Sequence, residues 1–132
     1  METIVVPVRF PLTDRSLRTL REARRIVKER DGRLIILHVN LYQEARRTNP
    51  SDLKNAIEEE FGYMPRTRYA VKDGFILEQT LVEEILAEAP DVVVVGARRG
   101  GISGLIRRFI YDEPDMIPII EEELDCEIVT VD

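Results

Sequence analysis

The sequence holds few of the residues that build disulfides, metal centres and membrane spans. Cys126 is the one cysteine, so no disulfide can form within the chain, and with the one histidine, His38, it supplies no spaced set of metal ligands. The longest apolar runs are about five residues, whereas a membrane-spanning helix needs roughly 20. Because the acidic start Met1-Glu2 leads into a predicted strand rather than a signal peptide, we expect a cytoplasmic protein with no membrane partner.

Positive charge is also in deficit over the chain as a whole. Lysine and arginine number 19 against 25 aspartates and glutamates, and the net charge of -6 disfavours a general nucleic-acid binder. Arginine, which suits bidentate recognition of anions, recurs locally at Arg98, Arg99, Arg107 and Arg108. We therefore expect a small anionic ligand rather than a nucleic acid, although abundant arginine and glutamate are also typical of ion-pair networks in heat-adapted proteins.

The hydrophobic pattern predicts a single α/β domain over residues 1–132. Short aliphatic runs alternate with segments of helical periodicity. In chain order we predict a strand at 3–8, a helix at 14–30, strands at 34–39 and 68–71 separated by a helix at 51–61, a helix at 77–89, a strand at 92–95, a short helix at 105–110, a further helix at 112–124 and a strand at 127–131. Such alternation predicts a parallel sheet with right-handed crossovers and helices on both faces.

Local signals set the ends of the first helix and the environment of the cysteine. Thr13 or Asp14 can cap the helix start, and Asp31-Gly32 is expected to end it, with glycine in the left-handed conformation. Cys126, at the start of the last strand, is expected to be a small buried hydrophobic residue. The predicted apolar stripe of this helix comprises Leu17, Leu20, Ala23, Ile26 and Val27.

The run from Asp91 to Gly104 joins an uninterrupted aliphatic strand to a glycine-rich loop. Ligands of open α/β sheets bind where such strands end at their carboxyl edge. Glycines allow the backbone to approach an anion closely, and a hydroxyl and arginines would complete the site; the residues concerned are Gly96, Arg98, Arg99, Gly100, Gly101, Ser103 and Gly104. The alternative is a surface loop whose glycines only permit turns.

Two further groups bear on a site at this edge. Arg9 and Arg15 lie near the end of the first strand and the start of the next helix, so we expect both to reach the same crevice, although exposed arginines without a role are common. His38 has no nucleophile or orienting carboxylate at a recognisable spacing, which favours a packed strand-end histidine. We predict no catalytic residues and no metal site.

Four segments, in order and spacing, resemble the universal stress protein family. They are Val5-Val6-Pro7-Val8 followed by Ser16-Leu17-Arg18, then Leu34 to Val39, Asp91 to Gly96, and Cys126 to Val131. The resemblance covers nearly the whole chain. It implies a five-stranded parallel sheet in the order 3-2-1-4-5 with four helices, and a homodimer that often forms through the last strand.

Many members of that family bind ATP, so the resemblance implies ATP or AMP as a ligand. Their signature is a glycine after the fourth strand, a second glycine after two intervening residues, and, after nine more residues, Gly-Ser or Gly-Thr that opens the last helix. Gly96 matches the first position, the second falls on Arg99 with Gly100 one place late, and Arg9 replaces the aspartate that commonly ends the first strand. The residues implied to bind the nucleotide or anion are Pro7, Val8, Arg9, Val39, Gly96, Arg98, Arg99, Gly100 and Ser103.

The sequence leaves two main functions open, and as a third a slow ATP hydrolase, for which no positioned general base or complete metal site is visible. The first is a universal-stress-protein-like binding module for a nucleotide or another anion, without efficient catalysis. The second is a dimeric interaction subunit of the same fold that has lost nucleotide binding, because Asp112, Glu113 and Asp115 would place negative charge where a helix start would otherwise attract phosphate. A chelated Mg²⁺ would reconcile these carboxylates with a triphosphate.

Overall fold

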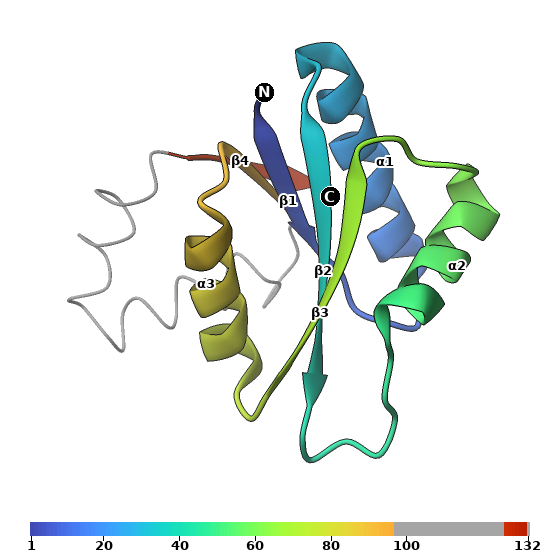
Figure 1. Ribbon diagram of the computed structural model, residues 1–132, viewed down its shortest axis with the longest axis vertical. Coiled ribbons are helices and arrows are strands. Elements are labelled where there is room, and N and C mark those ends of the chain that lie inside the picture. Colours follow the sequence, from blue (N-terminus) through green and yellow to red (C-terminus); the bar gives the residue numbers. More distant parts are fainter. Residues whose placement is uncertain (97–125, 132) are drawn as a thin grey trace.

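A computed structural model describes residues 1–96 and 126–131 of the chain. These residues form five strands and three helices (Figure 1). In chain order they are β1 (Thr3–Pro7), α1 (Asp14–Arg30), β2 (Arg33–Leu41), α2 (Pro50–Phe61), β3 (Thr67–Gly74), α3 (Leu77–Glu88), β4 (Val92–Gly96) and β5 (Glu127–Val131). The helices predicted at 105–110 and 112–124 lie outside the described residues.

The strands form one parallel sheet in the order β3-β2-β1-β4-β5. The predicted fold class and strand order are therefore confirmed. In Figure 1, α1 and α2 cover one face of the sheet and α3 covers the other. The sequence runs outward from β1 through β2 to β3, then returns to the other side of β1 for β4, so the order reverses between β1 and β4.

The core is two apolar layers, one on each face of the sheet. Alternate strand residues point to opposite faces, so Ile4 and Val6 of β1 pack in the layer beneath α1 and α2, whereas Val5 packs beneath α3. Leu20 of α1 and Leu53 of α2 are fully buried in the first layer. The central strands are buried on both faces, which explains their unbroken aliphatic sequence.

Helix α1 has the predicted bounds, but one residue at its end was assigned the wrong role. Thr13 caps the start, and its hydroxyl accepts a hydrogen bond from the Ser16 N–H at 3.2 Å. At the other end, Asp31 and not Gly32 takes the left-handed conformation, with φ of 50°. Gly32 is needed for space, since a Cβ there would lie 2.6 Å from Ile4 Cδ1 and 2.8 Å from the Glu2 carbonyl oxygen.

Strands β2 and β3 are longer than their apolar runs predicted. Their ladder continues through the pairs of Asn40 with Asp73 and of Leu41 with Gly74, which carry no alternating apolar pattern. The helix predicted at 77–89 ends one residue earlier, at Glu88, and Ala89 is its exposed left-handed cap. Cys126 packs against the layer beneath α3 as a hydrophobic residue would, but it is only partly buried and not buried as predicted.

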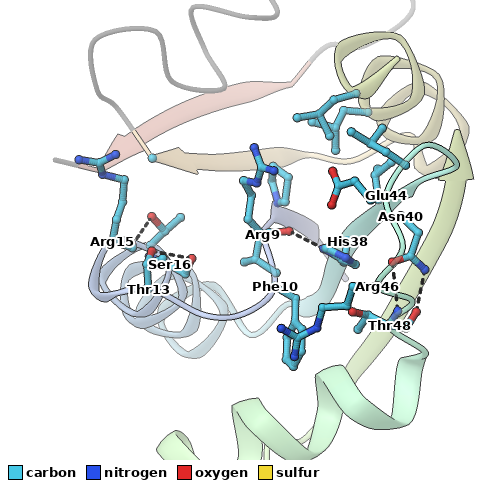
Figure 2. A pocket seen from close by; sticks show the side chains of 18 residues that line it. Arg9, Phe10, Thr13, Arg15, Ser16, His38, Asn40, Glu44, Arg46 and Thr48 are labelled. Atoms are coloured by element: carbon cyan, nitrogen blue, oxygen red, sulfur yellow. Dashed lines mark hydrogen bonds between the residues drawn. The ribbon is translucent and has the colours of Figure 1, made fainter. Parts of the chain in front are cut away.

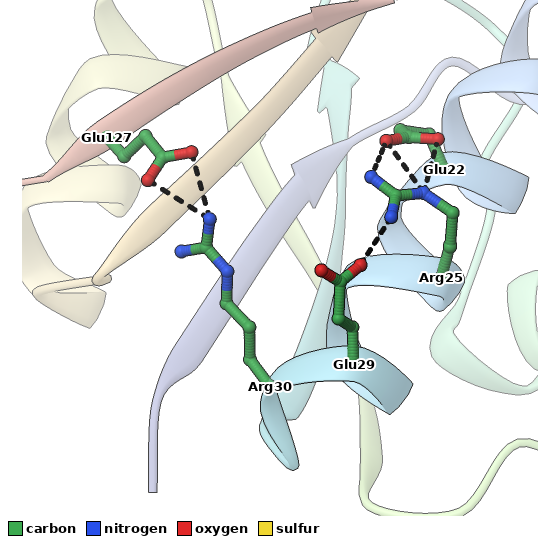
Figure 3. A network of polar contacts seen from close by, with 5 residues as sticks. All are labelled: Glu22, Arg25, Glu29, Arg30 and Glu127. Atoms are coloured by element: carbon green, nitrogen blue, oxygen red, sulfur yellow. Dashed lines mark hydrogen bonds and ion pairs between the residues drawn. The ribbon is translucent and has the colours of Figure 1, made fainter.

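Ion pairs connect the outer face of α1 to its surroundings (Figure 3). Arg30 at the helix end lies 3.1 Å from a Glu127 carboxylate oxygen on β5 and 3.7 Å from one of Glu2. Arg25 pairs with Glu22 and Glu29 one turn to either side. Exposed pairs of this kind contribute little to stability, so the apolar layers hold the helix in place and Arg30 marks its contact with the sheet edge.

Candidate functional site

A cleft of about 310 Å³ opens at the carboxyl edge of the sheet, where the strand order reverses between β1 and β4 (Figure 2). Open α/β sheets bind ligands at this position because the chain leaves β1 and β4 in opposite directions and the following segments diverge. The volume falls within the range of small-molecule sites, which is roughly 300–1,000 Å³. The fold thus places a hollow of binding size at this edge of the sheet.

The structure brings five of the nine predicted site residues to this cleft. They are Pro7, Val8, Arg9, Val39 and Gly96, which come from three neighbouring strand ends. Arg15, expected in the same crevice, also lines it. The remaining four, Arg98, Arg99, Gly100 and Ser103, lie outside the described residues.

Gly96 lets the end of β4 pass closely under the start of α1. A Cβ at this position would lie 3.3 Å from the Thr19 Oγ1 and 3.4 Å from the Arg15 Cδ. The Arg15 side chain therefore lies across the strand end at one side of the cleft, as Figure 2 shows. Three hydroxyls from the first turns of α1, those of Thr13, Ser16 and Thr19, belong to residues that line the same side and were not predicted from the sequence.

The cleft has the opposite charge balance from the chain. Its described lining contains three arginines, Arg9, Arg15 and Arg46, and one carboxylate, Glu44, which leaves an excess of two positive charges in a chain of net charge -6. The Arg46 guanidinium lies 5.1 Å from the centre of the Phe10 ring, an arrangement that holds the cation by the ring's negative face. Electrostatics therefore favour an anion in this hollow.

His38 is buried in β2, as expected for a packed histidine, and it also lines the cleft. Its Nδ1 lies 3.3 Å from the Val8 carbonyl oxygen, so a protonated Nδ1 donates there. Burial lowers the pKa of His38 below its usual value and the charge of Arg9 lowers it further, against opposing effects of Val8, Asn40 and Glu44. The ring is thus held neutral near pH 7.

Asn40 and Thr48 join the two ends of the segment that follows β2. The Asn40 side-chain amide donates to the Thr48 carbonyl oxygen at 2.7 Å, and its Oδ1 accepts from the Thr48 N–H at 3.2 Å. Both residues are buried and both line the cleft (Figure 2). This double hydrogen bond, which we call the Asn40 clamp, places Glu44 and Arg46 at the rim. The only sequence signal for it is a polar residue at the end of an apolar strand.

Part of the cleft lining is apolar. Val39 and Leu41 reach the cleft from β2, and Leu77 and Leu81 reach it from one face of α3. Small-molecule sites commonly combine such a surface with a few placed polar groups.

Within residues 1–96 and 126–131, no three carboxylate, histidine or cysteine side chains gather as a metal site would require, and no helix is long and apolar enough to cross a membrane.

Solved structures resemble this chain over nearly its whole length. The universal stress protein UspA from Lactobacillus plantarum superposes with a TM-score of 0.65 at 15% identity, over 99% of this chain and 97% of that one. A universal stress protein from Archaeoglobus fulgidus gives 0.61 at 16% identity, over 100% and 99%. The chain has the universal stress protein fold. No family model and no curated protein matches the sequence.

A third structure with the universal stress protein fold was determined in complex with cAMP. It superposes with a TM-score of 0.55 at 17% identity, over 97% of this chain and 96% of that one. At such identities the likeness establishes the fold and not the ligand. The fold does account for the cleft, because the order 3-2-1-4-5 creates the reversal between β1 and β4 at which it opens.

Proposed function

We propose that this protein is a universal-stress-protein-like module that binds a nucleotide or another small anion in the cleft at the carboxyl edge of the sheet. One observation carries the proposal: a hollow lined by Arg9, Arg15, Arg46 and the close-packed Gly96 concentrates positive charge within an acidic chain. The neighbour bound to cAMP supports the nucleotide form of the proposal, since it shows that this fold can hold such a molecule.

The two parts of the lining suit the two parts of a nucleotide. Arginine guanidinium groups form paired hydrogen bonds with phosphate oxygens, and Arg9 and Arg15 stand on the side of the cleft where β1 and β4 end. The leucines of β2 and α3 provide an apolar surface against which a base can pack. AMP and ATP are the candidates we propose.

The proposal is for binding without efficient catalysis. His38 Nδ1 faces a backbone carbonyl oxygen, not a carboxylate or hydroxyl that would make it part of a nucleophile-activating pair. Glu44 is the one carboxylate in the described lining, and one carboxylate with three arginines does not fit an Mg²⁺ site. We therefore assign no step to a metal ion.

Calorimetric titration of the purified protein with ATP, AMP and tripolyphosphate tests the proposal. We expect saturable binding of at least one nucleotide and a matching rise in Tm, because a ligand that binds only the folded state stabilises it. Arg9→Gln should weaken nucleotide binding by roughly tenfold, the cost of one charge-assisted hydrogen bond. Arg21→Gln, on the exposed face of α1 away from the cleft, is the matched control. The absence of saturable binding at millimolar nucleotide, with no change in Tm, would reject the proposed function.

We also propose a homodimer, which the family resemblance implies, and a cytoplasmic location, which the sequence predicts. Sedimentation velocity over a range of protein concentrations tests the dimer, and a monomer at every concentration would refute it. Among the described residues, no observation favours the alternative of an interaction subunit that has lost nucleotide binding.

A further inference from the structure

Glu44 is the one acidic side chain in the described lining of an otherwise positive cleft, yet its carboxylate joins no described residue by a hydrogen bond or an ion pair. The arginines that follow it are engaged elsewhere. Arg46 stacks on Phe10, and Arg47 lies 3.6 Å from Asp73 and over the Tyr42 ring. No described residue occupies the Glu44 carboxylate oxygens, so with respect to this part of the chain they can accept hydrogen bonds from a molecule in the cleft.

The backbone that carries Glu44 is held on both sides. The Glu44 N–H donates to the Leu41 carbonyl oxygen at 3.0 Å, and the Tyr42 N–H donates to that of Gly74 at 2.9 Å. The Asn40 clamp secures the far end of the segment at Thr48. These hydrogen bonds at Tyr42, Glu44 and Thr48 hold the segment at the rim of the cleft and place the exposed Glu44 there.

Glu44 and Arg15 stand on opposite sides of the cleft (Figure 2). Arg15 lies beside Gly96 at the end of β4, whereas Glu44 is tied to Leu41, one of the apolar lining residues, at the end of β2. The cleft is consequently asymmetric, with a cation beside Gly96 at one side and an acceptor beside apolar side chains at the other. A ligand that matches both sides carries an anionic group at one end and hydrogen-bond donors on a less polar part.

We propose that Glu44 is a specificity-determining residue that accepts hydrogen bonds from the hydroxyl or amino groups of a nucleoside, so that the cleft selects nucleotides over phosphate chains of similar charge. This inference rests on the proposed function and assigns recognition of the nucleoside part of the ligand to Glu44. A carboxylate only accepts hydrogen bonds at neutral pH. It therefore attracts a sugar or base that carries donors and repels a polyphosphate that has none.

The test compares ATP with tripolyphosphate in Glu44→Gln and Glu44→Ala. Removing the charge should weaken ATP binding by about fivefold in Glu44→Gln, whose amide oxygen still accepts, and by roughly tenfold in Glu44→Ala. The same changes should tighten tripolyphosphate binding about two- to threefold, because a like charge is removed at partly screened distance. The ratio of ATP affinity to tripolyphosphate affinity should thus fall for two reasons, because ATP binds more weakly and tripolyphosphate binds more tightly.

Glu59→Gln is the matched control, since Glu59 is exposed on α2, does not line the cleft and undergoes the same change of charge. It should leave both affinities unchanged. If Glu44→Gln and Glu44→Ala keep the wild-type ratio of the two affinities, the role of Glu44 is refuted while nucleotide binding that depends on Arg9 stands. If the wild-type protein binds neither ligand, the proposed function and this inference fail together.

Discussion

The Asn40 clamp makes a quantitative prediction about stability. Substituting Asn40→Ala removes two hydrogen bonds, of 2.7 and 3.2 Å, and deprives both backbone groups of Thr48 of their side-chain partner. Thr48 is only 4% exposed and Asn40 only 7%, so water does not reach these groups freely in the native protein. The free energy of unfolding should therefore fall by more than the loss of two exposed hydrogen bonds would suggest.

Each intramolecular hydrogen bond contributes about 1 kcal/mol net, and each buried group left unpaired costs about 1–3 kcal/mol. Two groups of Thr48 are affected, so we expect the free energy of unfolding to fall by about 2 kcal/mol if water enters the space left by the amide. If the space stays dry, the loss should approach about 4 kcal/mol. For a chain of this size that corresponds to a Tm lower by roughly 6–12 °C.

Urea unfolding followed by circular dichroism measures the change. Asn55→Ala is the control, because Asn55 is exposed on α2 and alanine favours a helix there, which should raise stability by about 0.5 kcal/mol. An Asn40→Ala variant within about 0.5 kcal/mol of the wild type, at unchanged m-value, would show that the clamp does not stabilise the fold. The Asn40 clamp would then not be what holds the rim segment that carries Glu44 and Arg46.

Two further predictions concern pH. Burial, and secondarily the charge of Glu58, raises the pKa of Tyr69 to about 12, so the unfolded chain loses this proton first and stability should fall as pH rises from about 10 towards 12. Tyr69→Phe should reduce that fall, as measured by urea unfolding at pH 8 and 11. Equal losses of stability in the variant and the wild type would contradict the role of Tyr69. Burial lowers the pKa of His38, so its ring should titrate below about 6.5 by proton NMR. Stability should fall as pH drops below that value, because the unfolded chain takes up the proton more readily. An NMR midpoint at or above about 6.5 would contradict the effect of burial on this pKa.

Helix α1 shows how far sequence reasoning reaches. Its bounds follow from apolar periodicity and a capping threonine, both of which are local signals. The exchange of roles between Asp31 and Gly32 was not predictable, because the need for glycine arises from Ile4 and Glu2, some 30 residues away in the chain. Likewise, β2 and β3 continue past their apolar residues because their backbones pair with each other.

The candidate site also contains some residues whose placement the sequence predicts and others whose placement it does not. Arg9 follows β1 and Gly96 ends the neighbouring parallel strand β4, and such strand ends meet at one edge of a sheet, so their approach could be predicted. The contribution of Glu44 and Arg46 could not, because it depends on a hydrogen-bonded pair eight residues apart around a polar segment without periodicity. The sequence thus predicts which strand ends meet at the cleft, but not how the segments between the strands complete it.

The parallel register has a practical consequence for attaching this protein to a surface or a label. Thr3 begins β1 at the edge away from the cleft, whereas Val131 on β5 lies in register with Gly96, at the cleft edge, about 16 Å further along the strand direction. A tether placed before β1 is attached at the edge of the sheet away from the cleft. One placed after β5 is attached at the cleft edge, so immobilised tests of the proposed binding should use the amino-terminal side.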